Sequence, residues 1–208
     1  MKVFLVEERD NQGNINGKFP FISTEGDVCD VPFGVQTIPE TALQTRGRPF
    51  FAPDFAYPFT FKVGWAFRLS RMGRHIEPRF ASRYYDAFAL CASMRAKRWA
   101  EKLHRQGLPT EPAYAFDNAL NLGSWLPLDQ LGTTTLKMDD QVLATHEAPS
   151  PDEIALRLSY VSCFYKINQG DILLVCNGPE IQDNRPFEQI NHIECTLGDE
   201  TALAFRIK

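Results

Sequence analysis

The chain has 208 residues, of which 44% are hydrophobic and 23% are charged, and its formal net charge at pH 7 is −4. These values suit one globular domain with a sizeable core and exclude an intrinsically disordered chain. No apolar run approaches the roughly 18 residues that a membrane-spanning helix needs. We therefore expect no membrane partner and a cytoplasmic location.

The cysteines are odd in number, scattered and without a Cys-x-x-Cys pair, which favours reduced thiols over disulfides or a zinc site. The histidines are also isolated and show no metal-ligand spacing. The cysteines are Cys29, Cys91, Cys163, Cys176 and Cys195.

The first third of the chain predicts two strands separated by a long loop-rich segment. Residues 1–6 read as a short strand, and residues 7–39 carry several turn signals such as Asn-Gly. Residues 59–69 alternate between apolar and other side chains, as a half-buried strand does. The apolar face comprises Phe61, Val63, Trp65 and Phe67. Lys62 and Gly64 lie on the opposite face, two residues apart.

The middle of the chain predicts a strand followed by a helix. The strand covers residues 84–91, and the helix begins near Met94 with Ser93 as its N-cap. Gly107 is expected to end this helix, with Pro109 just beyond it.

A second helix opens at Ser150 with a capping box and a proline at its first position. Its expected buried stripe consists of Ile154, Leu158, Val161 and Tyr165. Strands over residues 171–176, 190–197 and 202–208 close the chain. Because strands outnumber helices and do not alternate with them, the sequence predicts an α+β fold with a mostly antiparallel sheet.

Positive charge is concentrated in the middle of the chain. Residues 62–105 contain 11 of the 22 Lys and Arg residues but only three acids, so this segment is +8 and the remainder is −12. A nucleic-acid surface is one interpretation. The other is a basic hairpin and helix that pair with acids elsewhere, and we favour it because the aromatic residues follow core patterns. We accordingly expect no nucleic-acid partner.

Several blocks of residues follow one another in an order and spacing that are specific in combination. They are Arg48–Phe55, Gly73–Ala87, Glu101–Pro109, Ala115–Trp125 and Gly170–Asp171. This order resembles the fumarylacetoacetate hydrolase family, specifically its short bacterial members. The resemblance implies a mixed β-roll with flanking short helices over residues 39–208, preceded by an N-terminal strand and loop-rich extension over residues 1–38. It also implies a homodimer and Mg²⁺-assisted chemistry on 2-oxo or β-diketo acids.

The residues that hold Mg²⁺ in that family are replaced in this chain. The family's Glu-x-Glu pair aligns with Lys62 and Gly64, and the Asp that follows about 30 residues later aligns with Ser93. The charge of this set changes from −3 to +1. Mg²⁺ prefers oxygen ligands, usually including carboxylates. Restoring carboxylates at the three positions is expected to create a metal site.

Other family signatures are also altered. The Lys that precedes the family's Phe-Asp motif aligns with Tyr114, although Phe116-Asp117-Asn118 is kept. The family's Gly-Thr-Pro-Ala-Gly loop for the substrate carboxylate reads Cys176-Asn177-Gly178-Pro179-Glu180. An N-terminal Gly-Arg-Asn-Tyr signature aligns with Glu7-Glu8-Arg9-Asp10. We interpret the pair Glu7-Glu8 as solvated acids.

We therefore expect a family member that has lost Mg²⁺-dependent catalysis and has no metal cofactor. Lys62 is expected to reach solvent or to pair with a neighbouring carboxylate. The altered cleft is expected to accept a small anionic or 2-oxo-acid-like ligand through Lys62, Arg95 or Asn177. The full set of candidate pocket residues is Lys62, Gly64, Ser93, Arg95, Tyr114, Asp117 and Asn177.

A second interpretation stays open: an active, metal-dependent hydrolase or hydratase of 2-oxo or β-diketo acids with a rearranged site. Its displaced oxygen ligands would come from Asp54, Glu77, Asp117 and Glu180.

Overall fold

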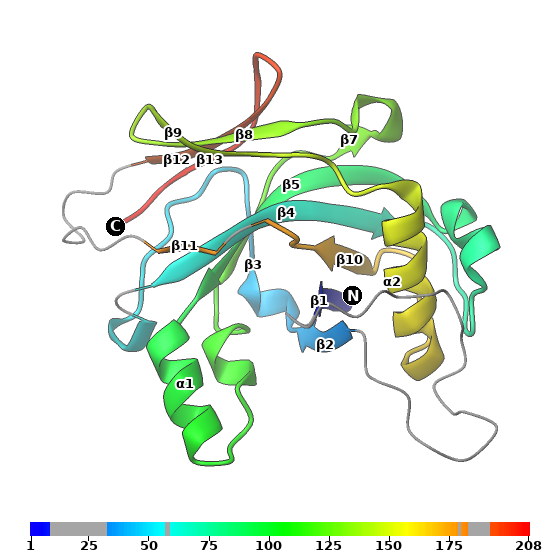
Figure 1. The fold of residues 1–208 in the computed structure, drawn as a ribbon, viewed down its shortest axis with the longest axis horizontal. Helices are drawn as coiled ribbons and strands as arrows, with labels where there is room; N and C mark the ends of the chain where they lie inside the picture. Colours follow the sequence, from blue (N-terminus) through cyan, green and yellow to red (C-terminus); the bar gives the residue numbers. More distant parts are fainter. Residues whose placement is uncertain (9–32, 57–58, 179, 183–191) are drawn as a thin grey trace.

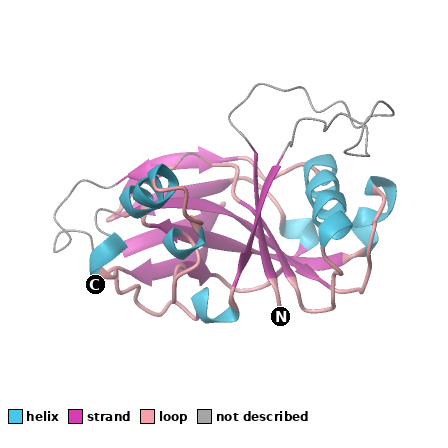
Figure 2. Cartoon of the chain, turned by 90° about the horizontal axis from the view of Figure 1, so that it is seen from below, coloured by secondary structure: helices cyan, strands magenta, loops and turns pink. Residues whose placement is uncertain are grey.

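The computed structural model describes residues 1–8, 33–56, 59–178, 180–182 and 192–208. These residues form two sheets with few and short helices (Figure 1). In the larger, nine-stranded sheet the strand order is β2-β1-β10-β4-β5-β6-β3, with β11 beside β4 and β7 beside β5. The second sheet has the order β13-β12-β8-β9. Figure 2 shows how strongly the strands of the larger sheet twist and cross.

The strands of the larger sheet are β1 (Val3–Glu8), β2 (Phe33–Ile38), β3 (Leu43–Thr45), β4 (Thr60–Leu69), β5 (Tyr85–Arg95), β6 (Leu120–Leu122), β7 (Leu126–Pro127), β10 (Ile172–Val175) and β11 (Ile181–Gln182). Those of the second sheet are β8 (Thr134–Met138), β9 (Gln141–His146), β12 (His192–Leu197) and β13 (Glu200–Arg206). The helices are α1 (Lys97–Arg105) and α2 (Pro151–Phe164), with 3₁₀ turns η1 (Glu40–Ala42), η2 (Asp54–Ala56), η3 (Pro78–Arg83), η4 (Glu111–Ala113) and η5 (Leu128–Gln130).

The α+β class with a mixed, mostly antiparallel sheet is confirmed. Parallel pairing joins β1 to β10 and β3 to β6, and the other described pairs of strands run antiparallel. The first strand is an integral part of the larger sheet, because Val3–Val6 pair with Ile172–Val175 of β10. The two α-helices of the described chain, nine and 14 residues long, are both too short to cross a membrane.

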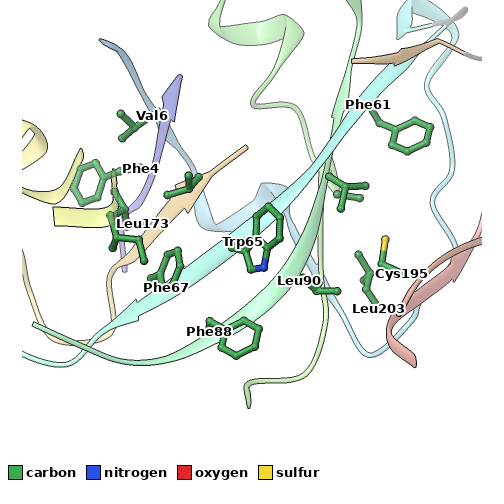
Figure 3. Close-up of a cluster of buried hydrophobic side chains, with 14 of the residues drawn as sticks. Phe4, Val6, Phe61, Trp65, Phe67, Phe88, Leu90, Leu173, Cys195 and Leu203 are labelled. Atoms are coloured by element: carbon green, nitrogen blue, oxygen red, sulfur yellow. The ribbon is translucent and has the colours of Figure 1, made fainter. Parts of the chain in front are cut away.

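The strand β4 forms as its alternation predicts and builds the centre of the core. Its apolar face contacts the second sheet and α2, and Figure 3 shows this cluster around Trp65 and Phe67, with Phe88 and Leu90 from β5. The opposite face of β4 carries Ala66 into a smaller cluster with β1, β5 and β10.

The helix α2 begins as predicted. The Ser150 side chain accepts a hydrogen bond from the backbone of Glu153, and the Glu153 carboxylate accepts one from the backbone of Ser150. Ile154, Leu158 and Val161 are buried, but Tyr165 lies beyond the end of the helix and is partly exposed. Its ring nevertheless packs on Phe4, with centroids 5.2 Å apart.

The expected start of the first helix is wrong. The strand β5 continues to Arg95 and α1 begins only at Lys97, so Ser93 is a strand residue and Ala96 is the N-cap. Ser93 pairs with Lys62 and Arg95 pairs with Thr60 across β4 and β5, and this pairing overrides the local capping signal. The end of α1 is as predicted, because Gly107 adopts a left-handed φ of 67°.

The interpretation of residues 7–39 as loop-rich also needs a correction where the chain is described. Residues 33–38 form β2, which pairs with the whole length of β1. Residues 9–32, with their turn signals and Cys29, lie outside the described residues.

The core predicts a large difference between two phenylalanine truncations. Phe67 is fully buried and its ring lies 5.5 Å from that of Tyr85, whereas Phe51 is 65% exposed. Phe67→Ala should lower the free energy of unfolding by about 3–5 kcal/mol because it leaves a cavity. Phe51→Ala should change it by less than about 0.5 kcal/mol. Urea unfolding of both variants measures this, and similar losses would contradict the assignment of the core.

Candidate functional site

The antiparallel pairing of β4 and β5 brings together the three positions where the sequence lacks its expected carboxylates. Lys62 lies directly opposite Ser93, and Gly64 lies opposite Cys91. Because side chains alternate along a strand, Lys62, Gly64 and Ser93 share the face that turns away from the main core.

A carboxylate from the first strand offsets part of the positive charge in this region. The Glu7 carboxylate accepts from Lys62 Nζ at 3.2 Å and from both terminal nitrogens of Arg95, at 2.6 and 3.3 Å. The strand β10 lies between β1 and β4 but ends at Val175. Glu7 follows Val6, the partner of Val175, so its side chain lies just past the end of β10 and reaches across to β4 and β5.

The ion-pair cluster of Glu7, Lys62 and Arg95 is largely removed from water. Arg95 is 4% exposed and its guanidinium lies over the ring of Tyr114, 5.5 Å from the centroid. The Glu7 side chain is 22% exposed. Burial would raise the pKa of Glu7, but the charges and hydrogen bonds of Arg95 and Lys62 outweigh it and hold the pKa below its ordinary value. The three charges sum to +1.

Gly64 allows the chain to approach closely at this point. A Cβ at this position would lie 2.3 Å from the carbonyl oxygen of Val175 and 2.9 Å from Sγ of Cys176. No side chain fits there unless the backbone moves. This geometry weighs against the expectation that restored carboxylates create a metal site, because the end of β10 fills the space beside position 64.

Two buried thiols lie beside Gly64. The described cysteines are free, and Cys91 and Cys176 are both buried. Their mutual hydrogen bond, together with burial, holds the pKa of the Cys91 thiol well above its ordinary value. Cys91 is therefore a neutral core residue and a poor nucleophile.

A cleft beside this cluster opens between the end of β5, α1 and the residues that flank η4. Its volume is about 340 Å³. Its lining residues are Arg95, Lys97, Ala100, Glu101, His104, Thr110, Tyr114 and Glu180. Of the candidate pocket residues, only Arg95 and Tyr114 line it.

The remaining candidate residues lie elsewhere. Ser93 is 1% exposed, and its hydroxyl finds no hydrogen-bond partner among the described residues. Asp117 is exposed in a turn next to Asn118, whose φ is 62°. Asn177 is also exposed.

The sequence did not lead us to Glu7 or to the residues of α1 that line the cleft. The interpretation of Glu7 as a solvated acid is wrong, because its carboxylate is paired with Lys62 and Arg95. Extending the first strand by two residues would have found it, since Glu7 alternates in phase with the buried Val3 and Leu5. By contrast, the expectation that Lys62 pairs with a carboxylate is met by Glu7.

The fit of these residues to a divalent cation is poor. An ammonium and a guanidinium occupy the face where the resemblance implies carboxylate ligands, and Gly64 has no room for one. In the described part of the chain, no three His, Cys, Asp or Glu side chains group in a way that could hold a metal ion. The oxygen ligands proposed for a rearranged site do not lie together either. Glu180 accepts a hydrogen bond from Thr60 at the start of β4, whereas Glu77 pairs with Arg79 beyond the end of that strand.

No family model matches the chain. The mitochondrial oxaloacetate tautomerase FAHD1 of Mus musculus is 23% identical over 176 residues, covering 82% of this chain and 78% of the relative. The Bos taurus protein of the same name is 24% identical over the same shares.

Solved structures show the same fold. A putative fumarylacetoacetate hydrolase family protein from Yersinia pestis superposes with a TM-score of 0.75 at 18% identity, over 100% of this chain and 92% of the other. Fumarylpyruvate hydrolase from Pseudomonas aeruginosa, in complex with Mn²⁺ and pyruvate, gives 0.74 at 16% identity, over 100% and 89%. The predicted β-roll type is thus confirmed. The chain is thus similar in sequence to oxaloacetate tautomerase FAHD1 and shares its fold with a putative fumarylacetoacetate hydrolase family protein.

The Glu7 ion pairs predict a stability loss that depends on pH. Glu7→Gln leaves Arg95 and Lys62 uncompensated and should lower the free energy of unfolding by about 3 kcal/mol at pH 7. Glu40→Gln is the control, because its exposed carboxylate lies 4.0 Å from the terminal amine, and it should cost less than about 0.5 kcal/mol.

The pKa of Glu7 is lower in the folded chain than its ordinary value of 4.5. The advantage of the natural chain over Glu7→Gln should therefore be complete above that value and shrink as the pH falls through the folded pKa. Chemical denaturation between pH 3 and 8 measures it. An advantage that is absent at pH 7, or that grows on acidification, would refute the assigned role.

Because Val175 and Cys176 approach Gly64 closely, even a methyl group at this position is expected to destabilise the fold. Gly64→Ala should destabilise the chain by about 1–3 kcal/mol through overpacking against Val175 and Cys176. Gly34 in β2 is the matched control, because a Cβ there meets no atom within 4 Å. Thermal unfolding of both variants distinguishes them, and equal melting temperatures would show that β10 does not close this space.

Proposed function

We propose that this protein is a member of the fumarylacetoacetate hydrolase family that has given up Mg²⁺-dependent catalysis and binds a small carboxylate-bearing metabolite. The observation that carries the proposal is the cluster in which Glu7 pairs with Lys62 and Arg95. An internal ion pair takes the place of a bound cation and its carboxylate ligands.

The electrostatics of the cluster support the loss of the metal. One net positive charge about 4 Å from a divalent ion costs roughly 8 kcal/mol at an effective dielectric constant of about 20. Glu7 is already shared by two cations, so its carboxylate is not free to offset this repulsion. Without a metal ion, the inherited way of polarising a substrate carbonyl is lost.

The proposed ligand class rests on the cleft and on the relatives. Arg95 is a buried guanidinium that lines the cleft, and guanidinium groups recognise carboxylates well. The Pseudomonas aeruginosa relative was solved with pyruvate, a small 2-oxo acid. A carboxylate-bearing metabolite of similar size would enter the cleft beside Arg95.

Calorimetric titration with Mg²⁺ and with Mn²⁺ tests the loss of the metal. We expect no saturable binding at micromolar affinity, and no turnover of acylpyruvates when either metal is added. Stoichiometric micromolar binding, together with turnover that EDTA abolishes, would overturn the proposal in favour of an active hydrolase with a rearranged site.

A further inference from the structure

We infer that the cleft beside Arg95 binds a zwitterion, a small ligand that carries an ammonium group as well as a carboxylate, such as a free α-amino acid. This inference rests on the proposed function, in which the same cleft binds a carboxylate-bearing metabolite. It narrows the ligand class from anions to zwitterions because the lining residues are not uniformly basic.

One wall of the cleft is a charged stripe along α1. Lys97, Glu101 and His104 are spaced four and three residues apart, so they lie on one side of the helix, and all three line the cleft. Tyr114 and Glu180 line it as well. The described lining residues therefore supply two cations, Arg95 and Lys97, and two carboxylates, Glu101 and Glu180.

The inner end of the cleft carries the surplus positive charge. Lys62 and Arg95 share the single carboxylate of Glu7, which leaves one positive charge uncompensated there. The Nε–H of Arg95 is buried and has no hydrogen-bond partner among the described residues. A ligand carboxylate at this end would meet a buried donor and a net positive field.

The other lining charges are Lys97, Glu101 and Glu180, which sum to −1. None of the three forms an ion pair with a described residue. Glu101 and Glu180 are both close enough to Tyr114 to influence the pKa of its hydroxyl. Burial raises the pKa of Tyr114, Arg95 lowers it, and Glu180 and Glu101 raise it further. A ligand ammonium between Glu101 and Glu180 would offset this negative charge.

Size and charge together favour a free amino acid over the alternatives. The cleft volume of about 340 Å³ is near the lower end of the roughly 300–1,000 Å³ of small-molecule sites. A dicarboxylic 2-oxo acid of similar size would place a second negative charge near Glu101 and Glu180, where like charges repel. A simple amine would leave the inner positive end unmatched.

The test is a calorimetric comparison of matched compounds on the intact chain. The first set is phenylalanine, phenylpyruvate and phenethylamine, and the second is alanine, pyruvate and ethylamine. We expect the tighter-binding amino acid to bind at least about tenfold better than the 2-oxo acid and the amine of its set. A 2-oxo acid that binds as well as its amino acid, or no binding by either amino acid, would overturn the inference.

Variants of the exposed acids locate the ammonium group. Glu101→Gln and Glu180→Gln should each weaken amino-acid binding about tenfold and leave 2-oxo-acid binding unchanged or stronger. Glu111→Gln is the control, because Glu111 is an exposed acid next to the cleft that does not line it. Equal effects of all three variants, or none, would contradict the placement.

The failures of the two proposals are distinguishable. Preference for 2-oxo acids without Mg²⁺ or Mn²⁺ binding would refute the zwitterion and leave the proposed function standing. Saturable metal binding at the β4–β5 face would refute the proposed function, whatever the cleft binds.

Discussion

The Glu7 carboxylate of β1 binds cationic side chains of two further strands, β4 and β5. Its side chain lies past the end of β10 and joins β1 to Lys62 on β4 and to Arg95 on β5. A guanidinium as buried as that of Arg95 is strongly destabilising without a partner. The pairing therefore allows Arg95 to stand at the inner end of the cleft, and it fixes the charge that any ligand meets there.

The packing of the residues at positions 62, 64 and 93 is interdependent. The absence of a side chain at Gly64 allows Val175 and Cys176 to close against β4. Ser93 is the small residue directly across from Lys62, so the long Lys62 side chain can extend toward Glu7. The face thus has a closely packed arrangement of its own, in which Glu7 offsets one of the two positive charges. A carboxylate introduced at position 64 would disturb that packing.

Elements that are marked by a pattern of neighbouring residues could be predicted from the sequence. The alternation of residues 59–69 predicted β4 and its two faces, and the capping box at Ser150 predicted the start of α2. The short strands β3, β6, β7 and β11 were missed because two or three residues carry too little pattern and are strands only through their partners. The capping signal at Ser93 was misleading because pairing with β4 extends β5 past it. Glu7 was missed because Lys62 and Arg95 are 55 and 88 positions away.

The most direct test of the central claim is a crystal grown with Mn²⁺ and pyruvate and measured at the manganese absorption edge. The account predicts no anomalous peak on the face of β4 and β5 that carries Lys62 and Ser93, with the Glu7 carboxylate still bound to Arg95. An anomalous peak coordinated on that face, with Glu7 released from Arg95, would contradict it.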